Sequence, residues 1–393
     1  MFQSTEFWAI FLALIGVFWL LPAANARWRA AALAAASLVA LYFVVGLQLP
    51  LIIIVAATPI WLHVAIRLTH TLGQRWPTIA WAVGLLPILV AWVVGKEAAA
   101  LEASPLSVLF FIGFSFVMIK CWTFLRDYHD GRIGEPELLM TAGYIFYFPT
   151  YISGPMHYFG EFDDAVRKPE KLNRQTLVDS VFRAMLGLVK IQLLVPLVMP
   201  FSLVVFQETG PTNPGALIGA AFAYSLVIWL DFSGYCDLAI ALSRILGLRV
   251  PENFNNPYFA SNIREFWQRW HITFSRVLTS YMFIPLVRTL QARSGLHPRI
   301  IAFIAYVATF AFCGYWHGPT LNFLLWGLYH AAGLIVYDIY RSRRRSSHAA
   351  GMETSGASVY GRWVRQGMAV ALTFSFVSMG WILFALPLSV LVR

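Results

Sequence analysis

The chain is dominated by apolar runs long enough to cross a lipid bilayer. A helix needs roughly 17–25 apolar residues to span the hydrocarbon core. Hydrophobic residues make up 59% of the 393 positions and charged residues 12%, against about 45–50% and about 25% in soluble domains. We therefore predict an all-α, polytopic membrane protein with about ten crossings. The runs lie near 6–22, 30–47, 50–68, 78–95, 105–125, 180–206, 216–243, 299–316, 320–340 and 366–388.

The distribution of basic residues predicts the orientation of these runs. The connections after the first and third runs hold arginines, whereas the connection with Lys96, Glu97 and Glu102 is net acidic. Because Lys and Arg accumulate in cytoplasmic loops, we expect the N-terminus to be extracytoplasmic. The first run has no basic residue before it and no cleavage site after it, so we expect a retained span. Basic loops also explain the net charge of +10, and no nucleic-acid partner is predicted.

Two apolar segments conflict with a simple succession of crossings. Residues 140–156 have basic residues on both sides, so both flanks should be cytoplasmic. Pro149, Gly154 and Pro155 would break a helix there. We predict a re-entrant segment, together with an internal cavity, because broken backbone at membrane depth must be buried in protein or line water. The same charge pattern around 272–287 predicts an interfacial or re-entrant segment.

No separate soluble domain is evident, so a single integral-membrane domain is predicted for residues 1–393. Its predicted parts are N-terminal helices at 1–119, a motif-bearing core at 120–340, a basic cytoplasmic loop at 341–365 and a C-terminal helix at 366–393.

His317 is an ionisable residue between two apolar runs, in the segment Trp316-His317-Gly318. Such residues at membrane depth are costly and usually functional. An unperturbed imidazole has a pKa of about 6.5. Burial favours its neutral form, which can accept a proton from an attacking hydroxyl. We therefore predict that His317 is a general base.

A second polar segment covers residues 263–275. If it is one helix, it has an aromatic face and a polar face. The aromatic face would carry Trp267, Trp270 and His271. The polar face would carry Arg264, Gln268 and Ser275. The pattern predicts a helix at the cytoplasmic interface, which by itself could be a membrane anchor. A histidine is not an ordinary anchor residue, which favours a functional role.

Asp231 and Asp237 lie within one apolar run. Six residues apart on a helix, they are about 240° apart in azimuth, so we expect separate partners rather than a carboxylate pair. Asp231 with Tyr235, one turn later, is predicted to form a buried polar network that shapes the cavity.

Metal, nucleotide and hydrolase chemistry find no support in the sequence. The nine histidines include no His-x-x-His or His-x-x-x-His pair, and the three cysteines include no Cys-x-x-Cys pair. No Gly-x-Ser-x-Gly elbow or phosphate-binding loop occurs. We expect no metal site.

Five motifs carry a resemblance to a known family. They are residues 148–155, residues 231–240, residues 251–258, residues 264–275, and Trp316-His317-Gly318 with residues 325–330. Together, and in this order, they resemble the membrane-bound O-acyltransferase family. More narrowly, they are similar to its bacterial branch of alginate O-acetyltransferases and D-alanyl transferases of lipoteichoic acid.

The resemblance implies a ring of transmembrane and tilted helices around a thin partition, where an external funnel meets a cytoplasmic entry. His317 matches the family's catalytic histidine. His271 matches a second signature position that other branches fill with Asn or Asp, which favours positioning or polarising the acyl group. Further candidate substrate or cavity residues are Trp316, Asp231, Tyr235, Asn255, Trp267, Trp270, Ser153 and Asn322.

The implied reaction moves an acyl group from a cytoplasmic thioester to a hydroxyl of an exported polysaccharide or other cell-envelope polymer. The donor is either acyl-CoA or the phosphopantetheine arm of an acidic acyl carrier protein, and no cofactor is expected to be bound permanently. A bacterial cytoplasmic membrane, with membrane lipid and extracytoplasmic accessory proteins as partners, is the expected setting.

The sequence does not distinguish the two acyl groups. Residues 278–288 depart from the alginate-type pattern, the chain length is nearer the D-alanyl transferases, and Asn322 is more like the acetylases. The acyl group stays open between acetyl and D-alanyl.

Two other functions compete with this one. A proton-coupled transporter or flippase for a glycan or lipid-linked substrate would use His317 and Asp231 as a proton relay, although no inverted repeat is evident. A scaffold of a cell-envelope complex is disfavoured by the two histidines and the acids in apolar runs.

Overall fold

The computed structural model describes residues 5–21, 25–45, 49–73, 77–100, 113–211, 213–349 and 359–391. These residues are nearly all helical and include no strand, which confirms the predicted all-α class. The chain divides into two compact units. The first unit comprises Met1–Gly187 and Tyr235–Pro251, and the second comprises Leu188–Gly234 and Glu252–Arg393.

Six helices in the described ranges are long and apolar enough to cross a membrane. They coincide with six of the ten predicted runs, so the chain is a multi-pass membrane protein, while the count of ten crossings stays a prediction. These helices are Trp81–Ala99, Arg174–Phe201, Pro214–Ile245, Pro298–His317, Leu321–Arg344 and Tyr360–Ala385. Residues 105–112 of another predicted run lie outside the described residues.

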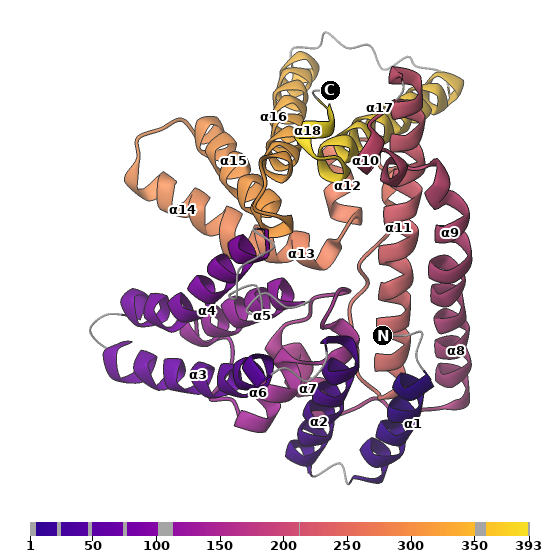
Figure 1. Cartoon of the computed structure of the whole chain (residues 1–393). Helices are drawn as coiled ribbons and strands as arrows, with labels where there is room; N and C mark the ends of the chain where they lie inside the picture. Colours follow the sequence, from indigo (N-terminus) through magenta and orange to yellow (C-terminus); the bar gives the residue numbers. More distant parts are fainter. Residues whose placement is uncertain are drawn as a thin grey trace. The chain divides into compact units, whose positions relative to one another are not determined.

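The first unit contains helices that pack mainly against their neighbours in sequence, such as α3 beside α4 (Figure 1). Their bounds are α1 Thr5–Leu20, α2 Ala26–Val45, α3 Leu49–Gly73, α4 Pro77–Ala100, α5 Phe114–His129, α6 Leu138–Ile145, α7 Phe159–Arg167 and α8 Arg174–Val189. A buried cation joins two of these elements. Lys120 of α5 donates hydrogen bonds to the Tyr144 carbonyl oxygen at 3.0 Å and to Thr150 Oγ1 at 3.3 Å. Such partners offset the cost of taking an ammonium group out of water.

The apolar segment 140–156 is broken in the structure, as its Pro and Gly residues predict. Helix α6 ends at Ile145, a short 3-10 turn (η2) covers Phe148–Thr150, and no regular element follows before α7. Gly154 has a φ of 106°, a left-handed conformation that favours glycine. Tyr147 is fully buried and donates a hydrogen bond to Ser243 Oγ at 2.9 Å. The broken backbone is therefore held inside protein, while its re-entry into a bilayer stays a prediction.

The second unit begins with short turns and continues with long helices. Its elements are η3 Lys190–Leu194, α9 Val195–Val198, η4 Met199–Phe201, η5 Leu203–Val205, α10 Phe206–Thr209, the first part of α11 Pro214–Ile245, η6 Pro257–Phe259, α12 Ile263–Arg269, α13 Ile272–Val277, η7 Leu278–Phe283, α14 Ile284–Arg293, α15 Pro298–His317, α16 Leu321–Ala349, α17 Val359–Ala385 and α18 Leu388–Leu391.

Helices α15 and α16 form a tight antiparallel hairpin (Figure 1). Gly314 of α15 and Gly327 of α16 lie directly against the backbone of the opposite helix, where a Cβ atom would collide with the carbonyls of Phe323 and Phe310. The missing side chains let the two backbones approach closely, as small residues do between membrane helices. The hairpin places His317 at its turn.

The basic run after residue 340 differs from its expected form, whereas residues 272–287 stay outside the six spanning helices, in agreement with the sequence. The basic run that starts at Arg341 was expected in a loop, but residues 341–349 continue α16 as helix. Arginine is a good helix former, so the run needs no loop. Residues 272–287 form α13, the π-helical turn η7 and the start of α14, and they are not among the six spanning helices.

Candidate functional site

The chain breaks at His271, and the prediction of a single helix over residues 263–275 is wrong. Helix α12 ends at Arg269, Trp270 is extended, and His271 has a φ of 44° and a ψ of 51°. A non-glycine residue in this left-handed region is uncommon and costs free energy. Such strained positions concentrate at functional sites.

The break is stabilised by a segment that precedes it in sequence. The backbone N–H of Asn255 donates to the Arg269 carbonyl at 2.9 Å, and the backbone N–H of Ile272 donates to the Asn253 carbonyl at 2.9 Å. These bonds engage backbone groups on both sides of His271 that a continuous helix would have used internally. The pairing therefore replaces helical hydrogen bonds at this point.

The break also separates the three side chains of the predicted aromatic face. Trp267 packs against Phe310, with 4.9 Å between ring centroids, whereas Trp270 packs against Trp381 at 5.4 Å. His271 instead lies 4.7 Å from the ring of Phe232. Each of the three residues thus has its own set of neighbours.

The side chain of Asn253 fixes the tautomer of the neutral His271 ring. Asn253 Oδ1 lies 3.2 Å from the backbone N of Thr273, 2.9 Å from Thr273 Oγ1 and 3.1 Å from His271 Nδ1. Because a backbone N–H can only donate, the Asn253 atom that faces it must be the oxygen. His271 Nδ1 therefore carries a proton and donates a hydrogen bond to Asn253 Oδ1, which leaves Nε2 as an acceptor in the neutral ring.

The two histidines predicted from sequence both contact one indole. The Trp316 ring centroid is 6.4 Å from that of His271 and 4.8 Å from that of His317. Phe274 packs against the same indole at 4.4 Å. Burial lowers the pKa of His271 well below its usual range, and the nearby His317 lowers it further. His271 is therefore neutral at pH 7.

His317 is more accessible than His271. It is the last residue of α15 and is half-buried, whereas His271 is only 3% exposed. Its ring lies 5.2 Å from that of Trp326 and 5.0 Å from that of Phe384. Aromatic rings thus hold the imidazole in place while part of it stays open to a reactant.

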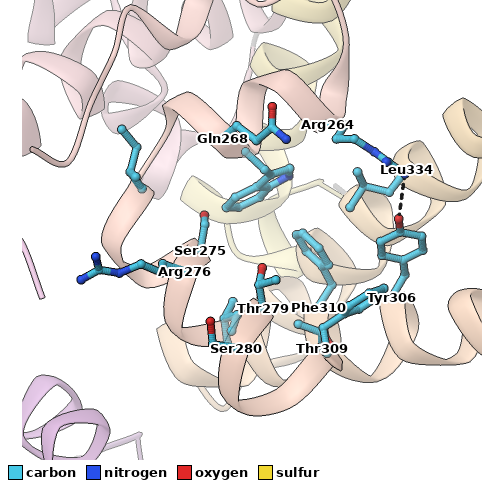
Figure 2. A pocket seen from close by; sticks show the side chains of 14 residues that line it. Arg264, Gln268, Ser275, Arg276, Thr279, Ser280, Tyr306, Thr309, Phe310 and Leu334 are labelled. Carbon is cyan, nitrogen blue, oxygen red and sulfur yellow. Dashed lines mark hydrogen bonds between the residues drawn. The ribbon is translucent and has the colours of Figure 1, made fainter. Parts of the chain in front are cut away.

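A pocket of about 500 Å³ lies between the segment from α12 to η7 and α15 (Figure 2), and neither histidine is among the described residues that line it. Arg264, Gln268 and Ser275, the three residues of the predicted polar face, all line it. The full lining is Arg264, Trp267, Gln268, Ile272, Ser275, Arg276, Leu278, Thr279, Ser280, Phe283, Tyr306, Thr309, Phe310 and Leu334.

Two buried polar groups in the pocket wall have no hydrogen-bond partner among the described residues. They are Nε1 of Trp267 and Oγ1 of Thr309, in side chains that are 8% and 4% exposed. An unpaired buried donor or acceptor is costly, so each marks a place where a ligand or a water would be favourable. The pocket therefore combines an apolar wall with a few polar groups, as small-molecule sites do.

Aromatic contacts connect the pocket to His317. The ring of Trp267 lies 6.0 Å from that of Trp326, which in turn contacts His317. Trp267 also contacts His330 at 5.1 Å. At the other end of the pocket, Arg264 donates to Tyr306 Oη at 3.1 Å, the bond drawn in Figure 2, and pairs with Asp338. Packed aromatic rings thus link one wall of the pocket to His317, and an engaged guanidinium group forms part of the lining.

Several predicted site residues have other contacts or exposure in the structure. Asp231 is exposed and forms no hydrogen bond with a described residue, so the buried network predicted with Tyr235 is wrong. Asn255 is exposed and contributes a backbone N–H. Asn322 interacts with Thr320 at the start of α16. Ser153 and Tyr235 belong to the first unit, where Tyr235 packs over Gly154.

Sequence reasoning missed Asn253, although it lies in the motif 251–258, two residues before the chosen Asn255. It also missed Thr309, which sits in an apolar run with no motif around it, whereas His330, which is completely buried, belongs to the motif 325–330. Among the described residues, no group of three or more His, Cys, Asp or Glu could hold a metal ion.

Comparisons with known proteins agree on one family. A model described as "MBOAT, membrane-bound O-acyltransferase family" matches residues 91–379. The peptidoglycan O-acetyltransferase of Helicobacter pylori is 30% identical over 247 residues, which is 62% of this chain and 43% of that protein. The probable alginate O-acetylase of Pseudomonas fluorescens is 29% identical over 319 residues, covering 79% of this chain and 57% of that protein. The teichoic acid D-alanyltransferase of Streptococcus thermophilus is 24% identical over 294 residues, covering 71% and 69%. The match thus spans about half the length of the first two relatives.

Proposed function

Because this chain belongs to the membrane-bound O-acyltransferase family, we propose that it transfers an acetyl or D-alanyl group from a thioester donor to a hydroxyl of an exported cell-envelope polymer. The observation that carries the proposal is the placement of His271 and His317 against Trp316, linked through the rings of Trp326 and Trp267 to a pocket with unpaired polar groups. His271 is held neutral, and His317 is partly exposed.

In the proposed reaction, His317 is the general base. It takes the proton from the acceptor hydroxyl as the oxygen attacks the thioester carbonyl. The carbon–sulfur bond then breaks, the new ester is released, and the proton returns from His317 to the leaving thiolate. The half-buried position of His317 suits this role, because the ring must meet a substrate and still stay largely out of water.

His271 would position the reactants. Its Nδ1–H is used by Asn253, so Nε2 can only accept a hydrogen bond while the ring is neutral. Polarising an acyl carbonyl needs a donor, which this tautomer lacks at Nε2. Of the two predicted roles, positioning therefore has the better support.

The pocket in Figure 2 would receive the arm of the thioester donor. A phosphopantetheine arm, whether on coenzyme A or on a carrier protein, is a narrow chain with two amides and a phosphate at one end. Trp267 Nε1 and Thr309 Oγ1 could pair with the amides, and Arg264, which also pairs with Asp338, would face the phosphate. No resident cofactor enters the reaction.

The acceptor class follows from the relatives, whose names refer to peptidoglycan, alginate and teichoic acid. All three polymers carry hydroxyl groups outside the cytoplasmic membrane. We place this chain in that membrane, with its basic loops and the donor on the cytoplasmic side and the N-terminus extracytoplasmic. Extracytoplasmic accessory proteins are further expected partners.

The test is transfer of radiolabelled acyl groups to the envelope polymer in membranes containing the wild-type chain or His317→Ala. We expect loss of label by a factor of at least about 100 in the variant, in the range of general-base contributions. The matched control is His297→Ala, which removes an exposed histidine that caps the start of the same helix. Normal labelling by His317→Ala would refute the mechanism. Export of the polymer with no covalently attached acyl label would instead favour the transporter hypothesis.

A further inference from the structure

We propose that Asp338 competes with the phosphate of the thioester donor for the guanidinium group of Arg264, and so limits how tightly the donor is held. This exchange rests on the proposed function, in which Arg264 faces that phosphate. Asp338 touches neither the acyl group nor the histidines in this arrangement. It acts through Arg264, as a positioning residue that sets affinity for the phosphate end of the donor.

Three polar side chains from three helices form a closed ring of contacts. Arg264 of α12 donates a hydrogen bond to Tyr306 Oη of α15 at 3.1 Å (Figure 2), and it pairs with Asp338 of α16. The Tyr306 hydroxyl donates in turn to Asp338 Oδ2 at 2.9 Å. Without a donor, the ring therefore gives the guanidinium group an anionic partner.

The members of this ring line two different pockets. Arg264 and Tyr306 line the pocket of about 500 Å³ in Figure 2, whereas Asp338 lines another pocket of about 380 Å³. The described linings of the two pockets have no residue in common. Asp338 thus reaches Arg264 without belonging to the wall of the donor pocket, and it has a separate space into which it can turn.

The second pocket offers other cations to the Asp338 carboxylate. Arg341, three residues further along α16, and Arg299 of α15 line it together with Asp338. Residues three apart on a helix are neighbours on its surface. A carboxylate that leaves Arg264 therefore stays near positive charge, so two arrangements of Asp338 are available.

The exchange is physically reasonable because the present ion pair is only partly buried. The side chains of Arg264 and Asp338 are 34% and 21% exposed, and such pairs contribute little net free energy. A phosphate can accept two parallel N–H bonds from one guanidinium group. Both present bonds of Arg264 use Nη2, so its Nε and Nη1 can reach a phosphate first. Two anions on one guanidinium group repel each other, which favours departure of the carboxylate.

The test compares 4′-phosphopantetheine with pantetheine, which has the same arm and lacks the phosphate. Binding of each to the purified protein in detergent is measured by isothermal titration calorimetry, and the ratio of the two dissociation constants is the readout. The wild type should bind phosphopantetheine more tightly. Asp338→Asn should increase this preference roughly 10-fold, as expected when a competing charged hydrogen bond is removed. If Asp338 merely orients Arg264 for the phosphate, the preference will decrease instead, which would overturn the proposal.

A double-mutant cycle separates exchange from a general effect of charge. Arg264→Gln should abolish the preference for phosphopantetheine, and adding Asp338→Asn to it should change nothing further, because the two residues act as one unit. An increase of the same size in the Arg264→Gln background would overturn the proposal, since Asp338 would then act on the phosphate directly. The control is Asp163→Asn, which removes a carboxylate paired with Arg167 at 2.9 Å in the first unit. It should keep the wild-type ratio, and an increase equal to that of Asp338→Asn would contradict a local exchange.

Labelled acyl transfer by the same wild-type preparation distinguishes this proposal from the proposed function. Equal affinity of the wild type for phosphopantetheine and pantetheine, or binding of neither, would overturn the exchange. If transfer to the polymer persists in that case, the proposed function stands without it. Preferential binding of phosphopantetheine that responds to the variants as described would support the exchange even in a preparation that transfers no label.

Discussion

Asn253 Oδ1 accepts a hydrogen bond from His271 Nδ1 at 3.1 Å, and this contact fixes which nitrogen of the histidine carries the proton. The same oxygen accepts from the backbone and hydroxyl of Thr273, so it cannot turn away without leaving buried donors unpaired. Asn253 is itself only 1% exposed. The orientation of His271 thus depends on a residue that does not reach the reacting atoms in the proposed mechanism.

Replacing Asn253 should separate the effects of geometry and charge. Asn253→Ala leaves three donors without an acceptor, which costs about 1–3 kcal/mol for a buried group and should reduce transfer strongly. Asn253→Asp keeps the acceptor but adds a negative charge beside His271, which favours the protonated ring and raises its pKa. When the pH is lowered, Asn253→Asp should therefore lose transfer activity at a higher pH than the wild type does. Superimposable pH–rate profiles would contradict this assignment.

His271 should make stability depend on pH. Its pKa in the folded protein lies well below the ordinary value because of burial and the nearby His317. As the pH falls through about 6.5, the unfolded chain binds a proton on this residue and the folded chain does not. The free energy of unfolding should therefore decrease below about pH 6.5, until the folded pKa is reached. His271→Asn should show a shallower decline of Tm between pH 7 and pH 5, and an unchanged slope would contradict the shifted pKa.

Thr309→Val should affect the donor but not the fold. Valine has the shape of threonine without the hydroxyl, and this hydroxyl has no partner among the described residues. Its removal should leave Tm unchanged or slightly raised, while KM for the thioester donor increases several-fold and kcat changes little. The control is Thr373→Val, a buried threonine of α17 whose hydroxyl bonds to the Ala369 carbonyl. A wild-type KM in Thr309→Val would place the donor arm elsewhere.

The close packing of α15 on α16 should not tolerate a single added carbon at its centre. Gly327→Ala would put a methyl group onto the backbone of α15, and overpacking of this kind costs about 1–3 kcal/mol. Because α15 carries His317, transfer activity should fall together with Tm. Gly367→Ala on α17, where a Cβ would meet nothing, is the control. Full stability of Gly327→Ala would show that the hairpin can separate at little cost.

The sequence by itself determined the membrane architecture, the two histidines and one face of the pocket. Apolar runs predict spanning helices because the cost of placing a segment in lipid depends on its own composition. His317 was identified for the same local reason, since an ionisable ring between two such runs is costly wherever it packs. The set Arg264, Gln268 and Ser275 was found from helical spacing, and all three residues line one pocket.

The tertiary structure alone decided what holds the site together. The break at His271 depends on Asn253, which is 18 residues away and competes for backbone hydrogen bonds that a local pattern assigns to a helix. Asp231 was expected inside because its neighbours are apolar, yet it is exposed, since burial depends on which face of the helix other elements cover. Thr309 becomes a candidate binding group only because the packing of α15 makes this residue part of the lining of a pocket. Hydrogen bonding and burial at these positions are set by partners distant in sequence, which composition and spacing do not encode.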